Sequence, residues 1–243
     1  MAMNEDLLRS AVQNNADLCD SVCRANGLAP QRTPMAWTSA TRTPSFYPDA
    51  ITLAADVDAE SILSLIDRSP GCSIKDSFAA LDLHPYGFSI LIEATWIGFP
   101  AGPVYTNRVE AGSIWTSVDS ASEFRDWVTA WRRTNAFSES AQGPGPDALI
   151  PALLDDPVIS FIWAREEDKI LAGAMVNRSV DAVGLLNFFT TGLKTSDTLK
   201  DCLGYIQAVS PNQPLVGYLE NSSLRFAGAA GFQFLGPLRI WVN

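Results

Sequence analysis

The sequence has a single histidine, His84, and its four cysteines lie at positions 19, 23, 72 and 202. A zinc site made of Cys and His needs closely spaced ligands of both kinds, so we expect no metal centre. A Ser-His-Asp triad would depend on His84 alone, and this residue is followed by Pro85, Tyr86 and Gly87, which is typical of a surface loop. We interpret His84 as a surface residue and the cysteines as free, reduced thiols.

Basic residues are also scarce. The chain has 17 Lys and Arg against 27 Asp and Glu, which gives a formal net charge of -10. Nucleic acids and anionic membranes are bound by basic faces, so we expect neither as a partner. An acidic surface favours solubility, and it would also attract a small cationic substrate such as an amine.

Long apolar runs are lacking as well. The longest falls short of the roughly 20 residues that a membrane helix needs. The N-terminal segment MAMNEDLL is acidic and has no apolar core of the kind found in signal peptides. We therefore expect a cytoplasmic protein. The length of 243 residues is enough for one large or two small domains with a real core.

The first part of the chain predicts a mixture of helices and strands. Periodicity and breakers indicate helices over 5–26 and 58–68, and strands over 35–37, 50–53, 73–78 and 88–99. Glu93 lies among the apolar residues of the last strand. If that strand is central and buried, a desolvated carboxylate there would be a good acceptor for a proton from an amine. The segment Pro100 to Pro103 ends this part, so we divide the chain into 1–103 and 104–243.

The second part has a more regular pattern. Ser120 and Glu123 form a capping box ahead of an amphipathic helix. Asn221, Ser222 and Ser223 would supply N-cap oxygens to a late helix, and Gly231 would end it. The remaining predicted elements are strands over 107–118, 158–164, 170–177, 183–190, 215–219 and 232–242, a short helix over 148–154, and a helix capped by Thr195 or Ser196.

The C-terminal stretch from Pro214 to Asn243, PLVGYLENSSLRFAGAAGFQFLGPLRIWVN, combines a strand, an Asn, a small-residue helix, Gly-Phe and a closing strand. Together with the element order, it resembles the GNAT N-acetyltransferase superfamily over about residues 104–243. The resemblance implies an α+β, GNAT-like acyl-CoA N-acyltransferase fold, with a central, mixed and mostly antiparallel sheet flanked by helices. Residues 1–103 would be a divergent N-terminal α+β part that completes this fold, and could be a truncated second copy.

The resemblance further implies that acetyl-CoA or another acyl-CoA lies between the fourth and fifth strands of the family fold. The family holds the pyrophosphate with backbone amides in the loop that opens the next helix. The matching positions here are Phe189, Thr190, Thr191, Gly192, Lys194, Thr195 and Ser196. This loop has one Gly where the family has two small residues, and Asp197 would compete with a phosphate. An ordinary capped loop is the alternative interpretation.

The family's general acid, a Tyr four residues before the Gly-Phe, is replaced here by Ala227. Asn221 could match the family's Asn, and Tyr218 is one of the nearest phenols. The candidate catalytic residues are therefore Glu93, Asn221 and Tyr218. The implied reaction moves an acyl group from a CoA thioester to an amine of a small molecule or protein, with strand amides stabilising the oxyanion.

Two other functions stay open. The missing Tyr and the irregular loop would also suit a catalytically degenerate GNAT-like protein that binds a ligand or partner without turnover. An unrelated α+β domain with a structural role is the third interpretation. A homodimer is left open.

Overall fold

The computed structural model describes residues 2–102, 115–134, 147–192, 196–220 and 223–243. In these residues the strands form one sheet in the order β1-β2-β3-β4-β11-β5-β10-β9-β8-β7-β6. The strands are β1 Gln31–Arg32, β2 Ala36–Thr38, β3 Ala50–Thr52, β4 Ser73–Asp76, β5 Ser89–Phe99, β6 Trp115–Ser117, β7 Ile159–Glu166, β8 Lys169–Arg178, β9 Val183–Thr190, β10 Leu215–Glu220 and β11 Gln233–Val242. The helices are α1 Ala2–Ala25, α2 Ala59–Leu63, η1 His84–Tyr86, α3 Ala121–Thr134, η3 Pro151–Asp155, α4 Ser196–Val209 and α5 Leu224–Ala229.

The sheet is mixed and mostly antiparallel, as predicted. Its parallel pairs are β3 with β4 and β9 with β10, and the other neighbours are antiparallel. Helices pack on both sides of it, which makes this an α+β fold. None of the described helices is both long enough and apolar enough to cross a membrane.

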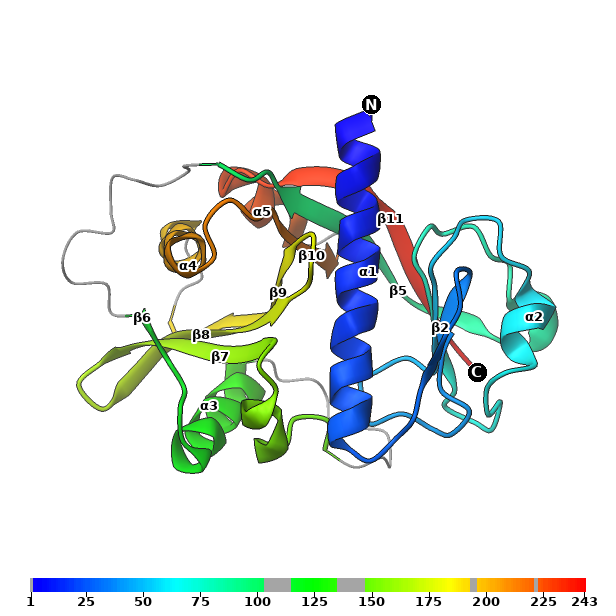
Figure 1. Cartoon of the computed structure of the whole chain (residues 1–243), viewed down its shortest axis with the longest axis horizontal. Coiled ribbons are helices and arrows are strands. Elements are labelled where there is room, and N and C mark those ends of the chain that lie inside the picture. The colour runs from blue at the N-terminus through cyan, green and yellow to red at the C-terminus, as the bar shows by residue number, and fades with distance from the viewer. Residues whose placement is uncertain (1, 103–114, 135–146, 193–195, 221–222) are drawn as a thin grey trace.

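Strand β5 lies inside the sheet, between β10 and β11. It pairs with β10 from Phe99 opposite Leu215 to Ala94 opposite Glu220, and it pairs with β11 along its other edge. Figure 1 shows β5, in green, beside the red β11. The two parts of the chain on either side of the expected division at residue 103 therefore share one sheet. Strand β5, from the first part, pairs with β10 and β11, from the last thirty residues.

Helix α1 crosses the middle of the molecule, with β2 on one side of it and β7 to β9 on the other (Figure 1). Val12, Cys19 and Cys23 are buried against the half of the sheet that contains β2, β3 and β5. Leu18 and Val22 are buried instead with α3, β7 and β8. The apolar face of α1 therefore packs against both halves of the sheet.

A buried pair of asparagines fixes α1 on the sheet. Asn14 Nδ2 donates to the carbonyl oxygens of Asn177 at 3.0 Å and Ala182 at 3.3 Å. Asn177 Nδ2 donates in return to the Asn14 carbonyl oxygen at 2.8 Å. Because buried polar groups are costly unless paired, these bonds set the position of the helix along the strands.

Several local predictions are confirmed. Ser120 and Glu123 form the capping box, with the Glu123 amide donating to Ser120 Oγ and the Ser120 amide to Glu123 Oε2. Gly27 and Gly231 follow helices with φ of 77° and 95°, a region that suits glycine. The predicted strand over 183–190 has the bounds of β9.

Other local predictions are wrong in extent. Helix α2 ends at Leu63, short of the predicted end at Arg68, and Leu65 beyond it is 43% exposed. In place of the predicted helix over 148–154 the chain forms the shorter 3-10 helix η3. This helix begins at Pro151, because proline fits only in the first turn of a helix. Ser223 precedes α5 without a side-chain capping bond. Asn221 and Ser222, and residues 107–114 of a predicted strand, lie outside the described residues.

All four cysteines are free and buried. Burial raises the pKa of Cys19 to about 11 and the pKa values of Cys23 and Cys72 to about 12. Burial also raises the pKa of Cys202. The thiols are therefore protonated at neutral pH and act as small apolar side chains.

These thiols should be unreactive in the folded protein. Because the thiolate is the reactive form, Ellman's reagent at about pH 8 should label none of the four within minutes. Unfolding in guanidinium should expose all four together. Absorbance at the reagent's usual wavelength gives both results, and fast labelling of one thiol before unfolding would contradict the burial described above.

The central position of β5 predicts that a chain beginning at Val104 cannot fold. Such a chain loses the partner of both β10 and β11, together with Trp96, Ile97 and Phe99, whose burial contributes about 1.5–3 kcal/mol each. It should be insoluble or lack fixed tertiary packing by near-UV circular dichroism, while the full chain melts in one cooperative step. A soluble 104–243 fragment with a sharp melt would instead favour two independent domains.

Candidate active site

Strands β9 and β10 begin together and then part. Their parallel pairing consists of Val183 opposite Leu215 and Gly184 opposite Val216. Beyond these pairs β9 continues to Thr190 along β8, and β10 continues to Glu220 along β5. The carboxyl ends of two neighbouring parallel strands are therefore separated, which is where ligands bind in many open α/β sheets.

A bulge interrupts β9 just beyond the point where it leaves β10. Leu186 lies opposite Met175 and Phe189 lies opposite Gly173, so Asn187 and Phe188 share one partner position on β8. Asn187 has a φ of 50°, a left-handed conformation that asparagine tolerates better than most residues. Bulges of this kind break the hydrogen-bond ladder and redirect backbone groups, often beside a functional site.

A pocket of about 250 Å³ lies where β9 ends and α4 begins. Thr190, Thr191 and Gly192 line it from the strand end, and Thr198 and Asp201 line it from α4. Its other lining residues are Trp115, Ala164, Lys169 and Leu171. The first-turn amides of a helix favour an anion, although Asp201 is a like charge beside any phosphate.

The loop in this pocket is held by β8. The Thr191 amide donates to the Leu171 carbonyl oxygen at 2.9 Å, and Thr191 Oγ1 donates to the Ile170 carbonyl oxygen at 2.7 Å. A methyl group added at Gly192 would meet nothing within 4 Å, so the backbone there is open to approach. This openness is the property that a backbone needs in order to contact a phosphate closely.

Only some of the predicted cofactor-binding residues lie in the pocket. Thr190, Thr191 and Gly192 come together in the pocket, and Ser196 is the first residue of α4. Phe189 is fully buried, with its ring edge-on to Trp127 at 5.3 Å, so its side chain belongs to the core beneath α3. Lys194 and Thr195 lie outside the described residues.

Tyr218 stands on β10 two residues beyond the last pair with β9, and it is half-buried. Its ring lies edge-on to Trp96, with 5.5 Å between ring centres, and Lys75 Nζ is 4.2 Å from the ring centre. Its hydroxyl makes no hydrogen bond to any residue that the structure describes. Asn221 follows β10 and falls outside the described residues. Sequence reasoning missed Lys75, whose position in a short polar strand gives no sign of burial.

The expected burial of Glu93 is wrong. Its side chain is 60% exposed, and its Oε1 lies 3.6 Å from Arg239 Nε. Exposed residues alternate along the first half of β5 because the apolar cluster with α4 and α5 begins only at Ile97. Glu93 also points to the face opposite Trp96 and Tyr218, since side chains alternate along a strand. The structure therefore does not bring Glu93 and Tyr218 together.

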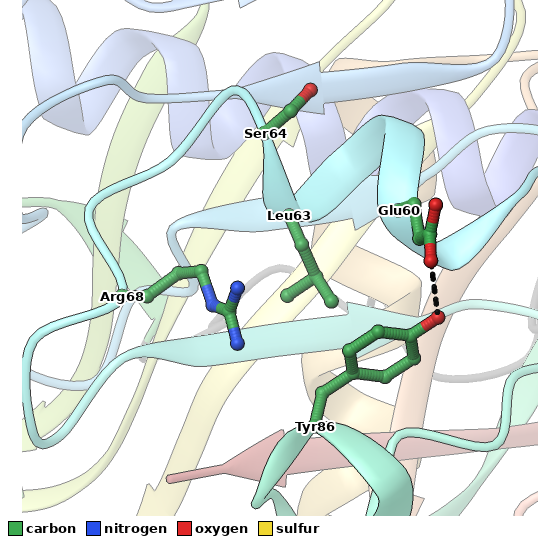
Figure 2. Close-up of a pocket in the computed structure, with 5 residues that line it drawn as sticks. All are labelled: Glu60, Leu63, Ser64, Arg68 and Tyr86. Carbon is green, nitrogen blue, oxygen red and sulfur yellow. Dashed lines mark hydrogen bonds between the residues drawn. The ribbon is translucent and has the colours of Figure 1, made fainter.

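A second pocket, of about 220 Å³, lies beside α2 and η1 and is lined by Glu60, Leu63, Ser64, Arg68 and Tyr86. Figure 2 shows the Tyr86 hydroxyl pointing to Glu60, to which it donates at 3.4 Å. This pocket is on the β4 side of the sheet, away from β9 and β10. His84 is exposed, as predicted, and its Nδ1 lies 2.8 Å from Asp82 Oδ1. Among the described residues no cluster of His, Cys, Asp or Glu could hold a metal ion.

Most of the chain is similar in structure to solved proteins, two of which are described as acetyltransferases. A GCN5-related N-acetyltransferase from Kribbella flavida superimposes with a TM-score of 0.64 and 11% identity over 96% of this chain and 95% of that one. A protein from Novosphingobium aromaticivorans, described as a putative acetyltransferase of the GNAT family, has a TM-score of 0.56 and 11% identity over 93% and 96%. A protein of unknown function from Staphylococcus epidermidis has a TM-score of 0.53 and 10% identity over 87% and 92%.

These likenesses show the GNAT fold in a divergent form. They extend over both parts of the chain, including residues 1–103. No protein-family model matches the sequence, and no curated protein matches it.

The placement of Glu93 gives a testable expectation. Glu93→Gln removes an exposed ion pair with Arg239, and exposed pairs contribute about 0–1 kcal/mol, so the melting temperature should change little. If Glu93 does not take a proton from the acceptor, acyl transfer by this variant should stay within about twofold of the wild type. A stopped-time assay of CoA release measures this, and a loss of a hundredfold or more would restore Glu93 as the base.

Proposed function

We propose that the protein transfers an acyl group from acetyl-CoA or another acyl-CoA to an amine of a small molecule or protein. The observation that carries this proposal is the separation of β9 and β10 immediately before the open loop at the start of α4. An extended acyl-CoA could lie between the two strands, with its phosphates at the N-terminus of α4. The likeness to acetyltransferases along the whole chain supports the same conclusion.

In this proposal the thioester carbonyl lies beside the bulge at Asn187 and Phe188. A backbone amide freed from the β8 ladder by the bulge would donate to the carbonyl oxygen as it becomes an oxyanion. A preorganised donor at that place favours the transition state over the ground state. Thr190, Thr191, Gly192, Lys194, Thr195 and Ser196 would contact the cofactor's phosphates, and Asn221 its amide-containing arm.

The amine would attack from the side of the sheet that carries α1. Tyr218 is on that side, and with Ala227 fully buried in the terminal helix it is the phenol we assign to proton donation. A protein that uses acyl-CoA and has four free thiols fits the cytoplasm. This location stays a prediction. An amine acceptor, on a small molecule or a protein, also stays a prediction, and a homodimer stays open.

A binding protein without turnover is the second candidate. Ala227 in place of a phenol and the exposed position of Glu93 both favour it, because they remove the two groups first expected to move protons. Such a protein would bind acyl-CoA but release no CoA in the presence of amines.

Titration with acetyl-CoA tests the cofactor site. At a concentration a hundredfold above its Kd, acetyl-CoA should stabilise the protein by about 2.7 kcal/mol, seen as a rise in melting temperature. Gly192→Glu places a carboxylate beside the phosphates and should weaken binding at least tenfold. Gly192→Ala is the matched control, because it adds an uncharged methyl group on the side that the phosphates would approach, and it should weaken binding less than Gly192→Glu does.

The same titration separates the candidate functions. Acyl transfer to any member of a broad amine panel, followed by CoA release, supports the enzyme. Binding without transfer supports the degenerate protein. No change in melting temperature at millimolar acetyl-CoA would refute both.

A further inference from the structure

A buried cation lies against the phenol ring of Tyr218. Lys75 is on β4, and only 2% of its surface is exposed. Its Nζ donates to Asn15 Oδ1 at 2.7 Å and lies 4.2 Å from the centre of the Tyr218 ring. Within the described residues no carboxylate forms an ion pair with it. Burying an ammonium without a counter-charge is costly, so this arrangement calls for a physical reason.

The ionisable groups that the structure describes around Lys75 do not supply that counter-charge. Cys19 faces it from α1, but burial outweighs the attraction of Lys75 and raises the pKa of this thiol to about 11. Tyr47 lies in the same interior, where burial raises the pKa of its phenol well above the usual value. Both groups are neutral at physiological pH. The positive charge is therefore met by the amide of Asn15 and by the ring face of Tyr218.

Tyr218 links this interior to the candidate active site. It lies on the strand that borders the opening between β9 and β10, two residues past their last pair. Trp96 holds one part of the ring edge-on while Lys75 lies over its face. The ring is therefore held at two places, and its hydroxyl has no hydrogen-bond partner among the described residues. A fixed phenol whose hydroxyl is not bonded by the described residues is suited to donate a proton to a bound reactant.

We propose that Lys75 is a positioning residue for Tyr218 in acyl transfer, an inference that rests on the proposed function. The ammonium holds the ring in place and stabilises the negative charge that forms on the phenol oxygen when its proton leaves. The low dielectric around Lys75 strengthens that interaction. Replacing the charge would leave the packing largely intact and remove this stabilisation.

The neutral amine nitrogen forms a bond to the thioester carbonyl carbon, and the carbonyl electron pair moves to oxygen. The carbonyl re-forms as the carbon–sulfur bond breaks, and the CoA sulfur takes the proton of the Tyr218 hydroxyl. The acceptor nitrogen loses its extra proton to solvent, and the Tyr218 phenolate takes a proton from solvent, which leaves an amide and the CoA thiol.

The cation could instead contribute only to packing. In that case Lys75→Met, which fills similar space without a buried charge, should leave turnover unchanged, because replacing buried charges by apolar groups is often neutral for stability. The two roles therefore differ in catalysis and not in folding. Melting temperatures of all variants establish that they fold.

The test compares the wild type with Lys75→Met, Lys75→Arg, Tyr218→Phe and the double variant Lys75→Met/Tyr218→Phe. With the best acceptor amine, Tyr218→Phe should lower kcat about a hundredfold and Lys75→Met about tenfold, with the KM for acetyl-CoA within about twofold. Lys75→Arg should recover part of the loss. In the double variant kcat should equal that of Tyr218→Phe, since Lys75 acts through the phenol.

A thioester with a more acidic thiol gives an independent signature. A thiophenyl ester of acetate expels a thiolate that needs little protonation, so the defects of Tyr218→Phe and Lys75→Met should both shrink severalfold. Arg125→Met removes a cation from the exposed face of α3 and should leave kcat unchanged for either thioester.

Unchanged kcat in Lys75→Met, or losses that multiply in the double variant, would overturn the role of Lys75 and leave the proposed function standing. Equal defects with both thioesters would overturn proton donation by Tyr218. An absence of transfer by the wild type across the amine panel would refute the proposed function, and this inference with it.

Discussion

The pairing of β5 with β10 on one edge and β11 on the other is the constraint on which the rest of the structure depends. Because β10 follows β5 along its whole length, it takes the twist of the half of the sheet that contains β4 and β11. Strand β9 follows β8 in the same way on the other side. Two strands committed to different partners in a twisted sheet must diverge, and the opening between them is the candidate active site.

The same constraint explains why α1 is needed. A strongly twisted sheet has a hollow face, and α1 fills it with apolar residues from Leu7 to Cys23. Its polar residues on that face are each given a partner: Asn14 with Asn177, and Asn15 with Lys75. The first hundred residues thus supply both the inserted strand and the helix that covers the sheet beside Tyr218.

Much of this fold could be predicted because its signals are local. The bounds of β9, the capping box at Ser120 and the glycine after α5 depend on residues close together in sequence. The exposure of Glu93 and the burial of Lys75 could not be predicted, since both depend on which distant element covers one part of a strand. An apolar run suggested a buried Glu93, and the tertiary packing reversed this; no prediction was made for Lys75, which the packing buries.

The distribution of carboxylates limits how protons can move in this site. Among the described residues the buried carboxylates are Asp49 and Asp76, and both are engaged in structural bonds. Asp49 accepts from Arg42, Thr43 and Ser73, and Asp76 accepts from the amides of Ala80 and Leu81. Neither is free to take a proton from an amine. In the proposed reaction an acceptor would therefore gain no help from these buried carboxylates, so its proton would go to water or to an exposed carboxylate such as Asp201, and the buried groups would act on the oxyanion and on the departing thiolate.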